Sequence, residues 1–252
     1  MEIAVAPAQD LAVIAADLYA SLLARKPDAV LGLATGSSPL ATYDELVRRY
    51  SAGEVSFAQA TAFTLDEYVG LPADHPECYR NVIEREFTGR VDFAPANVHG
   101  PDGQAADLEQ AGRAYEAAIK AAGGIDLQIL GIGSNGHIAF NEPGSPFTSR
   151  TRTLTLAEQT RIDNARFFGG DLAQVPTQCL TQGLGTIMEA REVVLVATGD
   201  NKAAAVRELV DGEPTTAWPA TVLQNHPRVT LLLDPAAASL LARSRERVAV
   251  TV

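Results

Sequence analysis

The sequence predicts an α/β fold built on an open, mostly parallel sheet with helices on both faces. Two observations predict it. Short apolar runs that read as buried strands alternate with longer segments in which apolar residues recur every three or four positions. Turns rich in small residues separate the two kinds of segment. Repeated alternation of strand and helix is typical of a parallel sheet covered on both faces, so we expect a Rossmann-like arrangement.

The pattern of each segment gives its type. Leu11, Ile14 and Leu18 fall on one face of a helix that Pro27 ends, and the apolar residues that follow form a short strand. In chain order we expect a helix over residues 9–23, a strand over 29–34, a helix after Pro39, a strand near 60–65, helices near 76–87 and 104–121, strands over 125–130 and 192–197, a helix over 201–210 and a strand over 229–233.

The chain shows no repeat, low-complexity tract or linker at which it could be divided. We therefore expect one domain over residues 1–252. Residues 151–176 differ from the rest, because their apolar pattern weakens and Arg152, Arg161 and Arg166 accumulate there. This composition indicates a lid segment, with a plain solvated insertion as the alternative.

Composition limits the classes of partner. A chain of 252 residues that is 46% hydrophobic can form a sizeable core without cross-links. Its net charge of −11 opposes non-specific binding to nucleic acid or to an anionic membrane. No signal-peptide pattern or long apolar run is present, and Cys78 and Cys179 match no metal-binding spacing. We expect a cytoplasmic protein with two free thiols.

The loop over residues 131–144 carries the strongest chemical signal. It begins with Gly131 at the end of the expected 125–130 strand, where open α/β sheets bind ligands. Its glycines allow close approach of backbone N–H groups to a ligand, and His137 and Glu142 are able to move protons near neutral pH. The combination indicates acid/base chemistry on a small molecule. A histidine after glycines also occurs as an ordinary loop or capping residue.

A second loop suits an anion. Thr35, Gly36, Ser37 and Ser38 lie between a strand and the start of a helix, where free backbone N–H groups and the helix dipole attract phosphate. An ordinary helix cap followed by proline is the alternative. Two cations could add to such a site: Lys202 follows another strand end, and Arg166 lies in the lid segment.

Two adjacent carboxylates follow the strand near 60–65. Asp66 and Glu67 should project at the same sheet edge as the two loops, and successive side chains of an extended segment point to opposite faces. We expect one carboxylate to face the ligand and the other to contact a structural partner. A solvated turn that exposes both is the alternative.

Together these segments resemble the glucosamine-6-phosphate deaminase family, and the resemblance covers nearly the whole chain. The matching motifs lie in the order found in that family. They are residues 31–36 (LGLATG), 65–71 (LDEYVGL), 75–77 (HPE), 136–143 (GHIAFNEP), 149–152 (SRTR), 164–168 (NARFF) and 180–181 (LT).

The resemblance implies conversion of glucosamine 6-phosphate and water to fructose 6-phosphate and ammonia, a step of amino-sugar catabolism, without a metal or organic cofactor. His137 would move a proton between the anomeric hydroxyl and the ring oxygen, with Glu142 orienting the imidazole. Asp66 would then take the C2 proton and return it at C1. By the same resemblance, the residues that would bind the substrate or its phosphate are Thr35, Gly36, Ser37, Ser38, Gly131, Arg166 and Lys202.

The chain departs from the family pattern in places that bear on function. Many members have aspartate where this chain has Asn135, which would still belong to the ring-opening group but leaves more of the charge stabilisation to Glu142. Members activated by N-acetylglucosamine 6-phosphate have lysine where this chain has Leu154, a serine where it has Pro146, and a C-terminal extension beyond the position of Val252. We therefore expect no activation by that sugar. Cys78 replaces a usual serine and is expected to change local packing alone.

Other functions remain open at this point. A galactosamine-6-phosphate deaminase needs one or two different pocket contacts, and 6-phosphogluconolactonases share the fold but continue their histidine loop differently. A sugar-phosphate sensor without turnover is the alternative from another class. Retention of Asp66, His137 and Glu142 and the lack of a basic helix-turn-helix pattern argue against the sensor. The expected partner is a phosphosugar, not nucleic acid or membrane, with a homo-oligomer possible.

Overall fold

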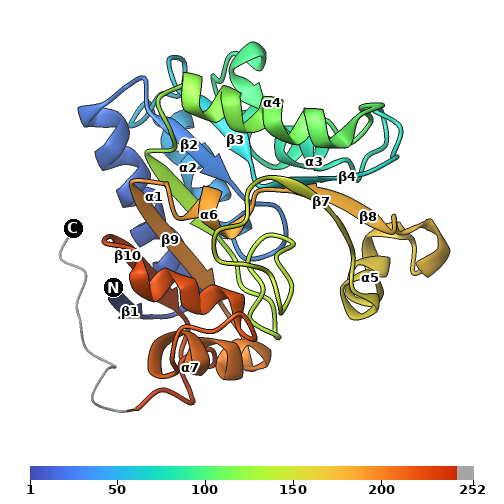
Figure 1. Cartoon of the computed structure of the whole chain (residues 1–252). Coiled ribbons are helices and arrows are strands. Elements are labelled where there is room, and N and C mark those ends of the chain that lie inside the picture. The colour runs from blue at the N-terminus through green and yellow to red at the C-terminus, as the bar shows by residue number, and fades with distance from the viewer. Residues whose placement is uncertain (243–252) are drawn as a thin grey trace.

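The computed structural model describes residues 1–242 and confirms the α/β fold (Figure 1). A mostly parallel sheet of seven strands forms its centre, with helices flanking it. The single domain predicted over 1–252 stays a prediction, and its residues 243–252 lie outside the described part. The strand order is β1 (Glu2–Val5), β10 (Val229–Leu233), β9 (Glu192–Ala197), β6 (Leu127–Leu130), β2 (Val30–Leu33), β3 (Thr61–Thr64) and β5 (Val98–His99).

The central strands are apolar because both of their faces are covered. Every residue of β2 and of β6 is buried, as expected for strands inside a parallel sheet. The predicted bounds of β9 and β10 match the structure. Strand β1 was not predicted from the sequence, because four residues at a sheet edge give too short a pattern to recognise.

The helices follow the apolar periodicity of the sequence, with shifts at their starts. The helix expected from residue 104 begins at Leu108, because Asp107 caps it by accepting a hydrogen bond from the Gln110 N–H at 2.9 Å. The helices are α1 (Ala8–Arg25), α2 (Leu40–Ser51), α3 (Tyr79–Glu86), α4 (Leu108–Ala121), α5 (Glu158–Asn164), α6 (Leu184–Ile187) and α7 (Ala203–Asp211).

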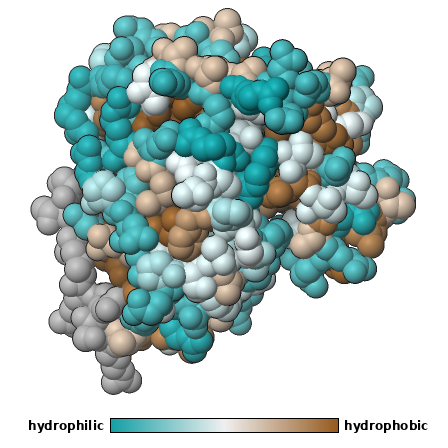
Figure 2. Space-filling view, viewed as in Figure 1, coloured by the Kyte–Doolittle hydropathy of each residue, from teal (hydrophilic) through white to brown (hydrophobic). Residues whose placement is uncertain are grey.

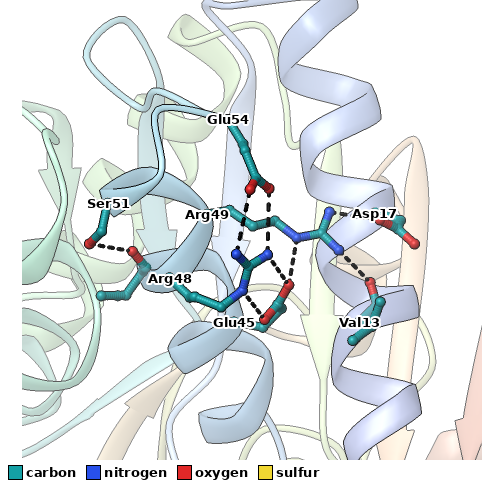
Figure 3. Close-up of polar contacts among 8 residues, drawn as sticks. Val13, Asp17, Glu45, Arg48, Arg49, Ser51 and Glu54 are labelled. Atoms are coloured by element: carbon teal, nitrogen blue, oxygen red, sulfur yellow. Dashed lines mark hydrogen bonds and ion pairs between the residues drawn. The ribbon is translucent and has the colours of Figure 1, made fainter.

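A charge network joins α1 to α2 (Figure 3). Glu45 accepts from the Nε atoms of Arg48 and Arg49, each at 2.8 Å. Arg49 then reaches α1, where its Nη1 lies 2.7 Å from a carboxylate oxygen of Asp17. Arg49 is buried, so its charge is compensated by two carboxylates rather than by solvent. The network joins α2, the helix that follows the loop over residues 35–39, to α1.

A second sheet branches from the first and was not predicted. It contains β4 (Asp66–Tyr68), β8 (Gln178–Thr181) and β7 (Arg152–Thr155), all antiparallel. The chain leaves the parallel sheet at Leu65, whose N–H still binds Leu33 O at 3.1 Å, and pairs with β8 from Asp66 onward. Strands of three or four residues with polar side chains give no clear alternation in the sequence.

The lid segment has structure of its own, which excludes a plain solvated insertion. It starts on β7 and carries α5, which projects from the body of the molecule in Figure 1. Figure 2 shows the same projecting lobe with a notch between it and the body. A second apolar cluster, separate from the main core, packs β4 and β8 against the lid segment. It contains Tyr68, Leu71, Cys78, Phe140, Leu156, Ala165, Phe168, Val175 and Cys179.

The helices of residues 1–242 include none with the length and apolar character needed to cross a membrane. Both cysteines are buried and free, as predicted. Within the same residues, no group of three or more His, Cys, Asp or Glu side chains is placed to hold a metal ion.

Candidate active site

The candidate site lies where the direction of chain connection reverses in the parallel sheet. From β2 the chain continues to its neighbour β3, whereas from β6 it continues to β9 on the opposite side. The loops after β2 and β6 therefore emerge side by side at the carboxyl ends of adjacent strands. Such a reversal point is where open α/β sheets bind ligands.

One cavity of about 410 Å³ brings most of the predicted site residues together. Loops after three strands, the lid segment and the start of α7 all contribute to its walls. Asn135 and Glu142 do not line it, but lie behind His137. The predicted residues that line it are Thr35, Gly36, Ser37, Ser38, Asp66, Gly131, His137, Arg166 and Lys202.

The loop after β2 leaves donors free at one end of the cavity. Gly36 has φ of +90°, a conformation that favours glycine. Pro39 is the N-cap of α2, and no side-chain hydrogen bond caps this helix start in the part of the chain that the structure describes. Ser37 and Ser38 are therefore not used as the helix cap. Their hydroxyls and the first backbone N–H groups of α2 are available to an anion.

Two cations face the same end. Burial lowers the pKa of Lys202, Asp163 raises it in part, and the nearby charge of Arg166 lowers it again. The guanidinium of Arg166 stacks on the Phe167 ring, with its central carbon 4.7 Å from the ring centroid. Two cations held close together in a partly buried wall repel each other, and a bound anion would relieve that repulsion.

His137 lines the cavity, and the carboxylate of Glu142 lies beside its imidazole. His137 Nδ1 lies 3.6 Å from Glu142 Oε1, beyond hydrogen-bond length, and has no hydrogen-bond partner among the described residues. Asn135 Nδ2 donates to Glu142 Oε2 at 2.7 Å, and Asn135 Oδ1 accepts the backbone N–H of His137 at 3.2 Å. Asn135 thus holds the carboxylate and the backbone rather than the imidazole itself.

Glu142 remains ionised in this setting. Burial would raise the pKa of its carboxyl, but the imidazole of His137 and hydrogen bonds from Thr160 and Asn135 lower it to about 2. The loop geometry also requires glycine, because a Cβ on Gly133 would lie 2.3 Å from the His137 ring. Ala139, with φ of 52°, adds local backbone strain beside the cavity.

The two adjacent carboxylates separate as predicted. Asp66 lines the cavity and is 5% exposed. Burial and the neighbouring charge of Glu67 raise its pKa to about 8, although the Thr181 hydroxyl lowers it in part. A carboxyl group with such a pKa is, once ionised, a stronger base than an ordinary aspartate, and it becomes ionised as the pH rises through about 8.

Glu67, on the face of β4 opposite to Asp66, has a structural role. Its Oε1 accepts the N–H groups of Tyr68 at 2.8 Å and Tyr79 at 2.9 Å, and its Oε2 accepts that of Arg80 at 3.1 Å. Burial raises the pKa of Glu67, and these three backbone donors lower it in part. Because Tyr79 and Arg80 begin α3, Glu67 caps that helix from a separate strand.

Sequence analysis did not predict some of the residues that line the cavity. Thr160 and Asn164 lie one turn apart on α5, and both line the cavity. Asn164 Nδ2 donates to the Tyr68 hydroxyl at 2.8 Å, and Tyr79 also lines the cavity. The spacing of four between Thr160 and Asn164 marks one helix face, but the lid segment had not been assigned a helix.

Arg152 and Leu154 on β7 are engaged within the chain. Arg152 donates to Asn141 Oδ1 at 2.9 Å and to Ser145 Oγ at 3.2 Å. Leu154 packs against the second apolar cluster. The position at which activated members have lysine is therefore occupied by a side chain that serves internal packing.

Comparison with known proteins identifies the relatives of this chain. A family described as glucosamine-6-phosphate isomerases/6-phosphogluconolactonase matches residues 4–232. The glucosamine-6-phosphate deaminase of Mycolicibacterium smegmatis is 70% identical over 228 residues, which are 90% of this chain and 87% of that protein. That of Beutenbergia cavernae is 66% identical over 96% of this chain and 93% of the relative.

Solved structures agree with the sequence relatives. The structure of a monomeric glucosamine-6-phosphate deaminase is 43% identical with a TM-score of 0.93, covering 95% of this chain and 100% of that one. A 6-phosphogluconolactonase from Trypanosoma brucei has a TM-score of 0.76 at 23% identity, covering 96% of this chain and 98% of its own, and shares the fold. This chain belongs to the glucosamine-6-phosphate isomerase/6-phosphogluconolactonase family.

Proposed function

We propose that this chain is a glucosamine-6-phosphate deaminase of amino-sugar catabolism. It converts glucosamine 6-phosphate and water to fructose 6-phosphate and ammonia. One observation carries the proposal: a single cavity places the anion-binding loop, two cations, a buried carboxylate and a histidine within reach of one small molecule. The names of the relatives at 66–70% identity support it.

The substrate phosphate binds at the end formed by the loop after β2. Backbone N–H groups of residues 35–38, the hydroxyls of Ser37 and Ser38, and the side chains of Arg166 and Lys202 supply its donors. Gly131 lies beside Ser38, since a Cβ at Gly131 would be 3.3 Å from the Ser38 hydroxyl, so glycine leaves this end open.

The sugar ring then lies toward His137 and Asp66. His137 takes the proton of the anomeric hydroxyl and delivers a proton to the ring oxygen, so that the C1–O5 bond breaks and an aldehyde forms. The ionised carboxylate of Glu142 stabilises the imidazolium that carries the proton between the two oxygens. Asn135 holds that carboxylate in place.

Asp66 performs the isomerisation. Its carboxylate takes the C2 proton of the open chain, which gives an enolamine, and returns a proton at C1 to leave an iminium at C2. Water adds to C2, and the nitrogen departs as ammonia. The raised pKa of about 8 makes Asp66 a suitable base for a weakly acidic C–H group.

A panel of three substrates tests the proposal. Ammonia release and fructose 6-phosphate formation are measured from glucosamine 6-phosphate and compared with turnover of galactosamine 6-phosphate and of 6-phosphogluconolactone. We expect turnover of the first substrate. Preferred turnover of either alternative would replace the proposed substrate, and phosphosugar binding without any turnover would favour the sensor.

Two further proposals concern where the enzyme is located and how it assembles. We place the enzyme in the cytoplasm, in keeping with a phosphorylated substrate. The relative with a TM-score of 0.93 is described as monomeric, so a monomer is the expected state. Light scattering measures the mass directly, and a multiple of 26.6 kDa would support the homo-oligomer instead.

A further inference from the structure

The carboxylate of Glu142 accepts hydrogen bonds from its own loop and from the lid segment. Its Oε2 accepts from Asn135, on the same loop, at 2.7 Å. Its Oε1 accepts the hydroxyl of Thr160, which lies on α5 of the lid segment. The same Oε1 is the atom that faces His137 Nδ1 at 3.6 Å. The Thr160 hydroxyl and the His137 imidazole thus lie next to the same carboxylate oxygen of Glu142.

Thr160 is placed to set the orientation of that carboxylate. It is 6% exposed, and its hydroxyl hydrogen is directed at Glu142. Without this bond, Oε1 would keep only the imidazole neighbour, which is beyond hydrogen-bond length, and the carboxylate could rotate about the Asn135 contact. Thr160 also contributes to the lowered pKa of Glu142.

The face of α5 that carries Thr160 is the face that contacts the body. Asn164, one turn later, donates to the Tyr68 hydroxyl at 2.8 Å, and Tyr68 lies two residues after Asp66 on β4. Arg166 follows directly after α5 and lines the cavity. Phosphate binding by Arg166 would therefore favour the same docked position of α5 that brings Thr160 to Glu142.

We propose that Thr160 is a positioning residue that couples the placement of the lid segment to the ring-opening pair. With α5 docked, its hydroxyl fixes the Glu142 carboxylate beside the His137 imidazole. With α5 displaced, Glu142 loses this donor and the pair loses its alignment. Ring opening then depends on a closed lid segment, which keeps the reactive aldehyde from forming in an open cavity. This inference rests on the proposed deaminase function.

The test isolates ring opening from deamination. In an Asp66→Asn background the C2 proton is not removed, so enzyme-catalysed exchange between the α and β anomers of glucosamine 6-phosphate reports ring opening alone. Exchange NMR measures its rate above the spontaneous rate. Thr160→Val removes the hydroxyl at similar volume, and Thr160→Ser keeps it. Glu158→Ala, at an exposed position of α5, controls for disturbance of the helix.

We expect Thr160→Val to slow anomer exchange by about tenfold or more, as for loss of a hydrogen bond to a charged group, with unchanged affinity for glucosamine 6-phosphate. In the otherwise unchanged chain, kcat should fall while KM stays the same. Thr160→Ser should restore exchange, and Glu158→Ala should not affect it. Equal losses in the valine and serine variants, or a loss explained by weaker binding, would overturn the proposal.

The same measurements separate this inference from the proposed function. Ammonia release by the unchanged chain is measured first, and its absence would reject the deaminase function alone. Anomer exchange no faster in the Asp66→Asn chain than in buffer would overturn the role of Thr160, because there would be no ring opening for it to control.

Discussion

Replacement of Asp66 by asparagine should abolish turnover and stabilise the fold at alkaline pH. Burial and the charge of Glu67 raise the pKa of Asp66 from 3.8 to about 8. The folded chain therefore holds this proton more tightly than the unfolded chain, and folding stability falls as the pH rises from about 4 to about 8. Asparagine is uncharged and nearly the same size, so it avoids this cost.

The size of the expected gain in folding stability follows from the shift in the pKa of Asp66. A change of about four pKa units corresponds to an upper limit of ~5 kcal/mol. The cavity beside Asp66 admits solvent, which lowers the cost of the charge, so we expect about 1–3 kcal/mol. For a domain of this length each kcal/mol raises Tm by roughly 2–4 °C, which predicts a rise of about 2–12 °C.

The assay is thermal unfolding of both chains at several pH values, in buffers without phosphate. The Tm difference should be near zero at about pH 4 and reach its full value at about pH 9. Glu213→Gln, an exposed carboxylate changed to an amide, is the matched control and should show no such pH dependence. A Tm difference that is independent of pH, or an asparagine variant less stable at about pH 9, would refute the reasoning.

Three other substitutions and one added sugar phosphate give further predictions. Glu67→Ala should lower stability by about 2–4 kcal/mol in chemical denaturation, because three backbone N–H groups lose their acceptor; an unchanged midpoint would contradict the capping role. Arg166→Lys should raise KM by roughly 10–100-fold with little change in kcat, and steady-state kinetics showing the reverse would remove it from phosphate binding. Asn135→Asp should place a second carboxyl group against Glu142; the pair should retain one proton and the parent's single negative charge at about pH 6 and lose that proton at higher pH, so kcat/KM should change less at about pH 6 than at about pH 8, and parallel pH profiles would argue against it. N-acetylglucosamine 6-phosphate should leave the rate curve unchanged, because Leu154 packs in an apolar cluster; a sigmoidal curve that it makes hyperbolic would contradict this.

Much of the fold could be predicted because the central strands and long helices have clear apolar periods. The bounds of β9 and β10 were predicted to the residue, since their runs are continuous and bounded by polar residues. The second sheet was missed because β4, β7 and β8 carry mixed polar side chains whose burial depends on the lid segment. Tertiary contacts, not local pattern, determine these strands.

The site residues on strand ends were predictable for a similar reason. Parallel strands bring their carboxyl ends together, so Asp66, Gly36 and His137 could be placed in one region from the sequence. Strand geometry also predicted that Asp66 and Glu67 would point to opposite faces, whereas the choice of Asp66 for the ligand side came from the family resemblance. Thr160 could not be found in this way, because its contact with Glu142 spans 18 residues and depends on how α5 docks.

One comparison tests the central claim most directly: binding and turnover of glucosamine 6-phosphate by the unchanged chain and by Asp66→Asn. Calorimetry gives the affinity, and coupled ammonia release gives the rate. We predict similar affinity for both chains and a rate loss of roughly a thousandfold or more in the variant, as for removal of an essential base. Turnover by Asp66→Asn near that of the unchanged chain would contradict the assignment of Asp66 as the base.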